Sequence, residues 1–136
     1  MVPSAATGLG ALAATIAGVA DEAGVDPAHV VVFGYSQGAA AALALAFAVG
    51  GLRAAAAVVG IAGWLADLPE LRWDLARRHT RVLLVHGSDD DVVPVVAGRS
   101  AARALRRHDV DVTFVERPGG HALTTDLLEP VRTWLA

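Results

Sequence analysis

The sequence predicts an α/β fold, a three-layer arrangement in which about four strands form a mostly parallel sheet with helices on both faces. Short β-branched runs alternate along the chain with longer segments rich in alanine and leucine, the pattern of strand–helix–strand units. Two of these runs are apolar at almost every position, which is typical of parallel strands covered on both faces. The 136 residues have the length of one domain, so residues 1–136 are expected to form a single unit.

The first third of the chain predicts a helix, a strand and a second helix. Residues 5–23 carry large apolar side chains at three- and four-residue steps, as one stripe of a helix does: Leu9, Leu12, Ile16 and Val19. The run VVVF at 30–33 is apolar at every position and predicts a strand buried on both faces. Residues 37–49 are rich in Ala and Leu and end at two glycines, so they predict a helix.

The middle of the chain predicts two more strands. The run AAAVVGIA at 55–62 is the next buried strand, and RVLLVHG at 81–87 is a third that ends in a glycine turn. Between them, residues 64–79 are amphipathic and predict a partly helical segment that Pro69 interrupts.

The last third of the chain predicts a helix, a strand and a closing helix. Pro94 suits the first turn of a helix that runs to about Arg107. The run VDVTFVE at 110–116 alternates more openly, so it predicts a fourth strand nearer the sheet edge. A Pro-Gly-Gly loop follows, and residues 123–135 predict the closing helix.

Composition narrows the possible functions. Every one of the 11 basic side chains is Arg, and 14 acidic residues give a net charge of −3, so a nucleic acid partner is not expected. The chain has no Cys, which excludes disulfides, a thiolate nucleophile and Cys-ligated metals. The compartment stays open on these grounds, with the cytoplasm as the default.

Two uncharged runs raise the question of a leader or a membrane span. Residues 1–20 lack the basic segment of a signal peptide, and their apolar rhythm continues past Asp21. Residues 30–52 are long enough to span a bilayer, but turn-forming and polar groups at 34–38 interrupt them. Burial in a folded domain explains both runs more simply, so no membrane span is expected.

The motif GYSQG at 34–38 lies between a predicted strand and a predicted helix. A strand that turns directly into a helix holds its central residue in a strained conformation, and flanking side chains would collide with backbone, which explains the glycines. Ser36 is then exposed at the carboxyl end of its strand as a candidate nucleophile. Gln37 starts the helix, so its backbone N–H is a candidate oxyanion donor.

A serine hydroxyl needs a base to become a nucleophile, and the base needs an acid to orient it. His121 follows the fourth predicted strand in a glycine-rich loop, where it can reach the carboxyl end of the sheet. The run SDDD follows the third strand and offers the acid. Adjacent carboxylates diverge and no further oxygen ligands are visible, so no metal site is predicted there.

Three segments together resemble a known family: GYSQGAAAALALA, HGSDDDVVP and GGHAL are similar to the motifs of the carboxylesterase/phospholipase branch of the α/β-hydrolases, which includes the acyl-protein thioesterases. The resemblance implies that Asp90, rather than Asp89 or Asp91, is the acid, because the family places it four residues after the histidine of HGxxDxxVP. It also implies that Trp64 and Leu65 stand where the family builds its acyl-binding wall, but a tryptophan at this position is equally consistent with a place in the core. His86 is expected to be a hydrogen-bonding support for the acid loop. No cofactor or metal is required.

The resemblance covers nearly the whole chain, but the family places several strands before the helix at 5–23. The chain is therefore expected to be the C-terminal part of an α/β-hydrolase domain. A missing upstream loop normally supplies a second oxyanion N–H, whose loss costs about 10²–10³-fold in rate. Strand 30–33 then becomes an open edge that needs covering: by residues 1–24, by a second copy in a homodimer, or by a missing N-terminal half.

These observations lead to one expected function and one alternative. The expected function is a serine hydrolase that cleaves carboxylic esters or thioesters through an acyl-enzyme on Ser36, with Asp90 and His121. The alternative is a catalytically silent chain that serves as a binding or assembly module, motivated by the missing oxyanion loop. The substrate is expected to be a small molecule or an acyl group. Its identity cannot be predicted, because loops outside the motifs build the acyl pocket.

Overall fold

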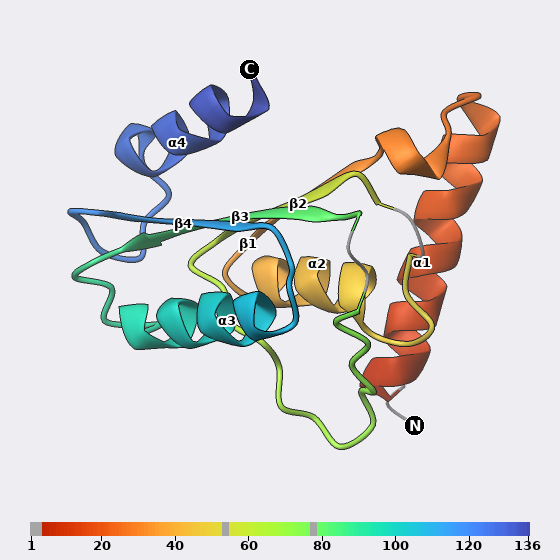
Figure 1. Ribbon diagram of the computed structural model, residues 1–136, viewed down its shortest axis with the longest axis horizontal. Coiled ribbons are helices and arrows are strands. Elements are labelled where there is room, and N and C mark those ends of the chain that lie inside the picture. Colours follow the sequence, from red (N-terminus) through yellow and green to blue (C-terminus); the bar gives the residue numbers. More distant parts are fainter. Residues whose placement is uncertain (1–3, 53–54, 77–78) are drawn as a thin grey trace.

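The computed structural model describes residues 4–52, 55–76 and 79–136. Strands and helices alternate along most of it, but no helix separates the second and third strands among the described residues (Figure 1). The elements are α1 (Ala5–Glu22), a short 3₁₀ turn (Pro27–His29), β1 (Val31–Tyr35), α2 (Gln37–Phe47), β2 (Ala57–Ile61), β3 (Arg81–Gly87), α3 (Val95–Arg107), β4 (Val112–Arg117) and α4 (Thr125–Leu135).

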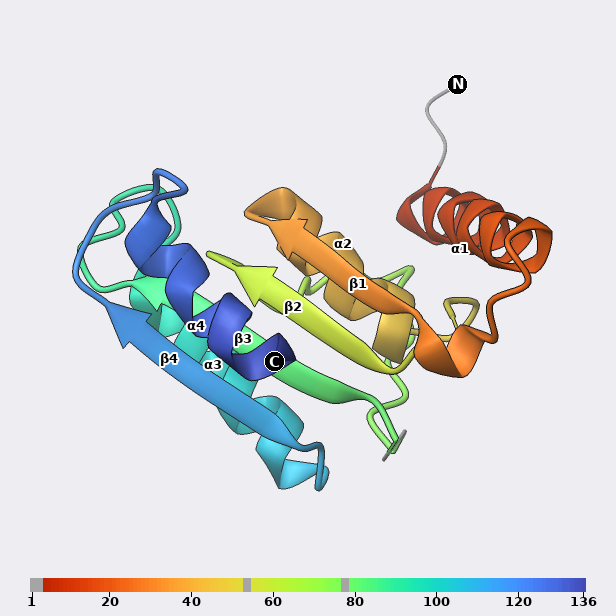
Figure 2. The same cartoon turned by 90° about the horizontal axis from the view of Figure 1, so that it is seen from above.

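The four strands form one parallel sheet in the order β1-β2-β3-β4. Helices α2 and α3 cover one face of the sheet and α4 covers the other, while α1 packs beside α2 at the β1 side (Figures 1 and 2). The α/β class, the parallel sheet and the helices on both faces are confirmed. Because all strands run the same way, their carboxyl ends meet at one edge, where the candidate residues follow β1, β3 and β4.

Two apolar clusters hold the layers together. Under α2 and α3, Leu43, Phe47 and Leu105 pack on alternate side chains of the strands. On the opposite face, Leu127 and Val131 of α4 pack against the other set. This division follows from the two-residue period of a strand, which sends successive side chains to opposite faces.

Helix α1 begins at the predicted residue and ends at Glu22, one residue earlier than predicted, and its buried stripe differs from the prediction. Leu9, Ala13 and Ala20 are buried and Ile16 is half-buried, whereas Leu12 and Val19 are 41% and 61% exposed. The predicted and the observed buried stripes share positions 9 and 16. The predicted stripe adds positions 12 and 19, whereas the observed stripe adds positions 13 and 20. Close packing on α2 selects the row with the small alanines, so the predicted stripe was wrong at Leu12 and Val19.

Strand β1 lies at an edge of the described sheet, as predicted, but it is not buried on both faces. Val32 packs toward α2, whereas Val31 and Phe33 on the other face are 43% and 48% exposed. Helix α4 lies over β3 and β4 and does not reach this part of the sheet (Figure 2).

The partly helical prediction for residues 64–79 was wrong over the residues that the structure describes there, while 77–78 lie outside them. The segment is irregular because its backbone bonds to the end of α2. Val49 N–H donates to the carbonyl of Arg72, and Asp74 N–H donates to that of Phe47. Across residues 4–52, 55–76 and 79–136, no helix has both the length and the hydropathy to cross a membrane.

Candidate active site

Ser36 alone makes the turn between β1 and α2. Its backbone has φ 56° and ψ −120°, a left-handed conformation that costs a side-chain-bearing residue about 1–3 kcal/mol. Hydrogen bonds hold it from both sides. Ser36 N–H donates to the carbonyl of Ile61 at 2.8 Å, and its own carbonyl accepts from Ala39 N–H at 2.9 Å. The strain therefore persists because β2 and the first turn of α2 over-determine the position.

The two flanking glycines are not equivalent. A Cβ on Gly34 would lie 2.1 Å from the carbonyl oxygen of Gly38, so this position admits no side chain without moving α2. A Cβ on Gly38 would meet nothing within 4 Å. The expected collision is confirmed at Gly34 and wrong at Gly38, because Gly38 lies on the exposed side of the first turn of α2.

His121 lies in the loop between β4 and α4 and contacts both other candidates. Its Nε2 is 2.9 Å from Oγ of Ser36, and its Nδ1 is 2.8 Å from Oδ2 of Asp90. The structure thus brings Ser36, His121 and Asp90 together in one hydrogen-bonded chain. With Nδ1–H donated to the carboxylate, Nε2 is free to accept the proton of the hydroxyl.

The loop before His121 closes tightly on the end of β3. A Cβ on Gly87 would lie 2.5 Å from the carbonyl oxygens of Gly119 and Gly120, so glycine is needed there. Asp89 N–H donates to the carbonyl of Gly119 at 2.9 Å. The acid loop and the histidine loop are therefore held against each other by backbone contacts.

Asp90 is 7% exposed, while the neighbouring Asp89 and Asp91 are exposed. Its Oδ1 accepts from the backbone N–H of Val92 at 2.9 Å and of Val93 at 2.8 Å. Burial acts to raise the pKa of Asp90, but the hydrogen bonds from His121, Val93 and Val92 outweigh it and hold the pKa below its usual value. The carboxylate is thus ionised at neutral pH and aimed at His121.

His86, at 1% exposed, supports the acid loop as expected. Its Nε2 lies 2.8 Å from the carbonyl oxygen of Val93 and 3.6 Å from Oδ2 of Asp90. A carbonyl only accepts, so Nε2 carries the hydrogen and donates it to Val93. This bond ties the loop that carries Asp90 to the end of β3.

Gln37 is the first residue of α2 and is exposed. The first N–H groups of a helix have no carbonyl of their own helix to bond, and the helix dipole makes this end favourable for negative charge. The N-terminus of α2 therefore presents donors beside the hydroxyl of Ser36.

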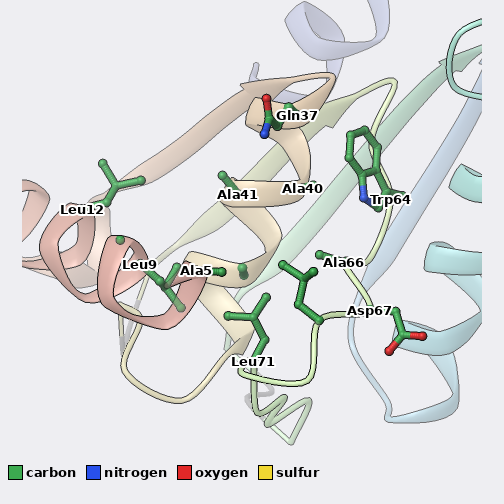
Figure 3. A pocket seen from close by; sticks show the side chains of 13 residues that line it. Ala5, Leu9, Leu12, Gln37, Ala40, Ala41, Trp64, Ala66, Asp67 and Leu71 are labelled. Atoms are coloured by element: carbon green, nitrogen blue, oxygen red, sulfur yellow. The ribbon is translucent and has the colours of Figure 1, made fainter. Parts of the chain in front are cut away.

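An apolar groove of about 500 Å³ begins at Gln37 and runs between α1, α2 and the segment after β2 (Figure 3). Trp64 lines it across from Gln37. Its other walls come from Asp67 and from small and apolar side chains that include Leu9, Leu12 and Leu71. Leu65 is placed differently, since it packs against the core cluster under α2 and α3.

Sequence reasoning missed the part of the groove built by α1. Leu9 and Leu12 were read only as a packing stripe, and nothing in their spacing says which of them faces a cavity. It also missed a contact of Tyr35 with His121, because no motif or required chemistry links a tyrosine at this position to the histidine loop. Within the described residues, no group of three or more His, Cys, Asp or Glu side chains could hold a metal ion.

The sharp strand–serine–helix turn, the parallel sheet and the acid and histidine loops at its carboxyl end define the α/β-hydrolase class. The family model described as Phospholipase/Carboxylesterase matches residues 9–136. The chain belongs to this family.

Individual relatives agree with that assignment. The chain is 31% identical over 125 residues to acyl-protein thioesterase 1 of Gibberella zeae, covering 84% of this chain and 50% of that protein. Its structure superposes on esterase PE8 with a TM-score of 0.74 and 31% identity, covering 91% of this chain and 57% of the other. For the SOBER1 protein of Arabidopsis thaliana the TM-score is 0.76 at 25% identity, over 93% and 60%. The chain thus spans about half the length of the curated relative it matches.

Proposed function

We propose that this chain carries the catalytic groups of a serine hydrolase that cleaves carboxylic esters or thioesters. The single observation that supports it most is the hydrogen-bonded chain from Ser36 through His121 to Asp90, built on a strained turn at the N-terminus of a helix. In this proposal residues 1–136 form part of one α/β-hydrolase domain, and no metal or cofactor takes part in the reaction.

In the first half of the proposed reaction, Oγ of Ser36 attacks the acyl carbon while its proton moves to Nε2 of His121. The backbone N–H of Gln37 stabilises the oxyanion that forms. The tetrahedral intermediate then collapses: the bond from the acyl carbon to the alcohol or thiol breaks, and His121 returns the proton to the leaving group.

In the second half, water attacks the acyl-enzyme and gives a proton to Nε2 of His121. The bond to Ser36 breaks, the carboxylic acid leaves, and His121 returns the proton to Oγ. Throughout, Asp90 accepts the hydrogen bond from Nδ1 and stabilises the imidazolium, and it does not take the proton itself.

The groove beside Gln37 is proposed to hold the acyl chain. Its walls are mostly apolar, although Asp67 also lines it, and it starts next to the residue that carries the oxyanion donor (Figure 3). Trp64 is the proposed wall nearest the reacting carbon. Leu65 packs against the core cluster next in sequence to Trp64, and its proposed role is to help position Trp64.

The test of the proposed function is labelling by a fluorophosphonate probe, which reacts with activated serines. We expect labelling of the wild type and none of Ser36→Ala. Persistent labelling of Ser36→Ala would refute Ser36 as the nucleophile. Turnover of p-nitrophenyl acetate above the Ser36→Ala background would argue against the alternative of a silent binding module.

The acyl site has its own test. Trp64→Ala should slow hydrolysis of p-nitrophenyl butyrate and octanoate more than that of the acetate, because only the longer chains reach along the groove. Equal losses of rate for all three esters would show that the groove does not bind the acyl chain, and they would leave the assignment of Ser36 as the nucleophile intact.

The open edge of β1 is proposed to pair with another strand. Ser36 N–H and the carbonyl of Val30 bond to the β2 side, so the alternation of a parallel strand turns the backbone groups of Val31 and Phe33 outward. No strand among the described residues pairs there. Two occupants fit: a second copy of the chain, or a polypeptide that corresponds to the rest of the relatives' length.

Sedimentation at micromolar concentration separates these occupants. A dimer that Phe33→Lys dissociates and Val49→Lys leaves intact supports the second copy, because Val49 is an equally exposed apolar residue that lies off the edge. A well-folded monomer would exclude it. A cytoplasmic location is only the default, because the sequence leaves the compartment open, and it stays a prediction.

A further inference from the structure

His121 is carried by a loop with unusual backbone freedom. Gly119 and Gly120 precede it, and Gly119 has φ 134°. Glycine loses more conformational entropy on ordering than any other residue, so a side chain placed after two of them needs anchors. Asp89 N–H holds the carbonyl of Gly119 on one side, and Thr124 caps α4 on the other.

At His121 itself the anchor comes from β1. The hydroxyl of Tyr35 donates a hydrogen bond to the backbone carbonyl oxygen of His121. The two rings also lie against each other, with centroids 5.3 Å apart and planes tilted by 35°. Tyr35 is itself held, because its ring packs at the edge of the cluster that α4 forms with the sheet.

We propose that Tyr35 is a positioning residue: its hydroxyl fixes the backbone of His121, and its ring limits the tilt of the imidazole, so that Nε2 stays at Oγ of Ser36. This inference rests on the proposed function, because it assigns a role toward the same base. It goes beyond that proposal because Tyr35, which is not one of the three residues Ser36, His121 and Asp90, is given the role of holding His121 in place.

The chain order makes this anchor effective. Tyr35 and Ser36 are adjacent, and hydrogen bonds from β2 and α2 hold the turn that they share. The nucleophile and the anchor of the base are therefore parts of one rigid segment. A change in the position of β1 moves both together, and the distance between Oγ and Nε2 is preserved.

The contact also indicates that Tyr35 does not take part directly in the reaction. Its hydroxyl hydrogen points at a carbonyl oxygen, so it is not aimed at the hydroxyl of Ser36 or at an oxyanion beside Gln37. The expected signature is a lower rate of attack by Ser36 with little change in substrate binding. A displacement of about 1 Å at a reacting group can cost about 100-fold, so partial release of the loop should be measurable.

Tyr35→Phe tests the hydroxyl alone, because the ring remains. Loss of one neutral hydrogen bond is expected to slow fluorophosphonate labelling by about fivefold to tenfold. For ester hydrolysis, kcat should fall while KM changes little. The matched control is Thr80→Val, which removes another buried hydroxyl donating to a backbone carbonyl, that of Ala55 at 2.7 Å and outside the candidate site.

A second measurement does not need activity. The imidazole Nδ1–H of His121, hydrogen-bonded to Asp90, should give a downfield proton resonance in the full chain. We expect Tyr35→Phe to broaden or shift this resonance and Thr80→Val to leave it unchanged. Wild-type labelling and a wild-type resonance in Tyr35→Phe would overturn the proposal, as would equal slowing by Thr80→Val.

The two measurements keep the proposals distinguishable. If the wild type reacts no faster than Ser36→Ala, the proposed function fails, and the resonance alone decides whether Tyr35 holds His121. If the wild type reacts and Tyr35→Phe reacts equally fast with an unchanged resonance, the positioning role fails while the proposed function stands.

Discussion

Asp90→Asn isolates the orienting role of the acid with almost no change in shape. The two backbone donors, Val92 N–H and Val93 N–H, converge on the same carboxylate oxygen, Oδ1. In the amide this oxygen must stay the acceptor, because the opposite orientation would place an NH₂ group against two N–H donors. The NH₂ group then takes the position of Oδ2 and faces Nδ1 of His121.

That arrangement forces the wrong tautomer on the base. Nδ1 has to accept from the amide, so Nε2 carries the hydrogen and cannot take the proton of Ser36. We expect the rate of reaction at Ser36 to fall by about 10⁴, equivalent to about 5.5 kcal/mol of activation free energy. The cost to folding should be only about 1–2 kcal/mol, because the three charge-assisted bonds of the carboxylate, to Val92, Val93 and His121, are replaced by neutral ones.

The assay is the second-order rate constant of fluorophosphonate labelling at neutral pH, with thermal unfolding measured in parallel. Asp89→Asn and Asp91→Asn are the matched controls, since both side chains are exposed and next in sequence. They should keep the wild-type rate. Labelling of Asp90→Asn within about tenfold of wild type would refute the tautomer argument, which requires a loss near 10⁴. A comparable loss in either control would assign the effect to the charge of the loop.

Gly34→Ala should lower the free energy of unfolding in a urea titration by about 2–3 kcal/mol, because its Cβ would overlap backbone, whereas Gly38→Ala should lose none. His86→Phe removes the donor to the partly buried carbonyl of Val93 and should cost about 1–3 kcal/mol, with slower labelling that His86→Gln partly restores; an unchanged labelling rate would contradict this role. The lowered pKa of Asp90 means that its ionised form stabilises the fold above the usual carboxyl pKa and loses this effect as pH falls through the lowered value. The difference in unfolding free energy between wild type and Asp90→Asn should therefore be constant near neutrality and shrink in acid, and a difference that grows in acid would contradict the sign of the shift.

The strands and their order along the chain could be predicted because each is a local signal. A β-branched run that ends in glycine depends on no distant residue, and β3 begins and ends at the predicted residues. The exposed face of β1 could not be predicted from such local signals. The apolar run at 30–33 predicts that packing elements would stabilise both faces of the strand. Whether a helix covers Phe33 depends on where α4 packs, which the local sequence does not determine.

The candidate site divides in the same way. Ser36 and His121 were found because each lies in a short motif whose chemistry requires its neighbours, and Asp90 was selected by resemblance among three adjacent carboxylates. The walls of the groove could not be found. They combine the first turns of α1 with the irregular segment after β2, and the rotation of α1 that exposes Leu12 is decided by alanine packing on α2.

The span between the reacting groups explains the composition of the histidine loop. Ser36 follows β1 and His121 follows β4, so the loop must cross the ends of two intervening strands, about 14 Å at the usual spacing of about 4.8 Å. The chain bends at Pro118, Gly119 and His121, so its backbone covers only part of this span, and the side chains of His121 and Ser36 cover the rest. The loop also passes close over Gly87, where a Cβ would lie 2.5 Å from the carbonyl oxygens of Gly119 and Gly120. Gly119 has φ 134°, a conformation that a residue with a side chain rarely adopts. Glycines contribute no side-chain contacts, and for this reason the loop depends on backbone anchors from Asp89 and Tyr35.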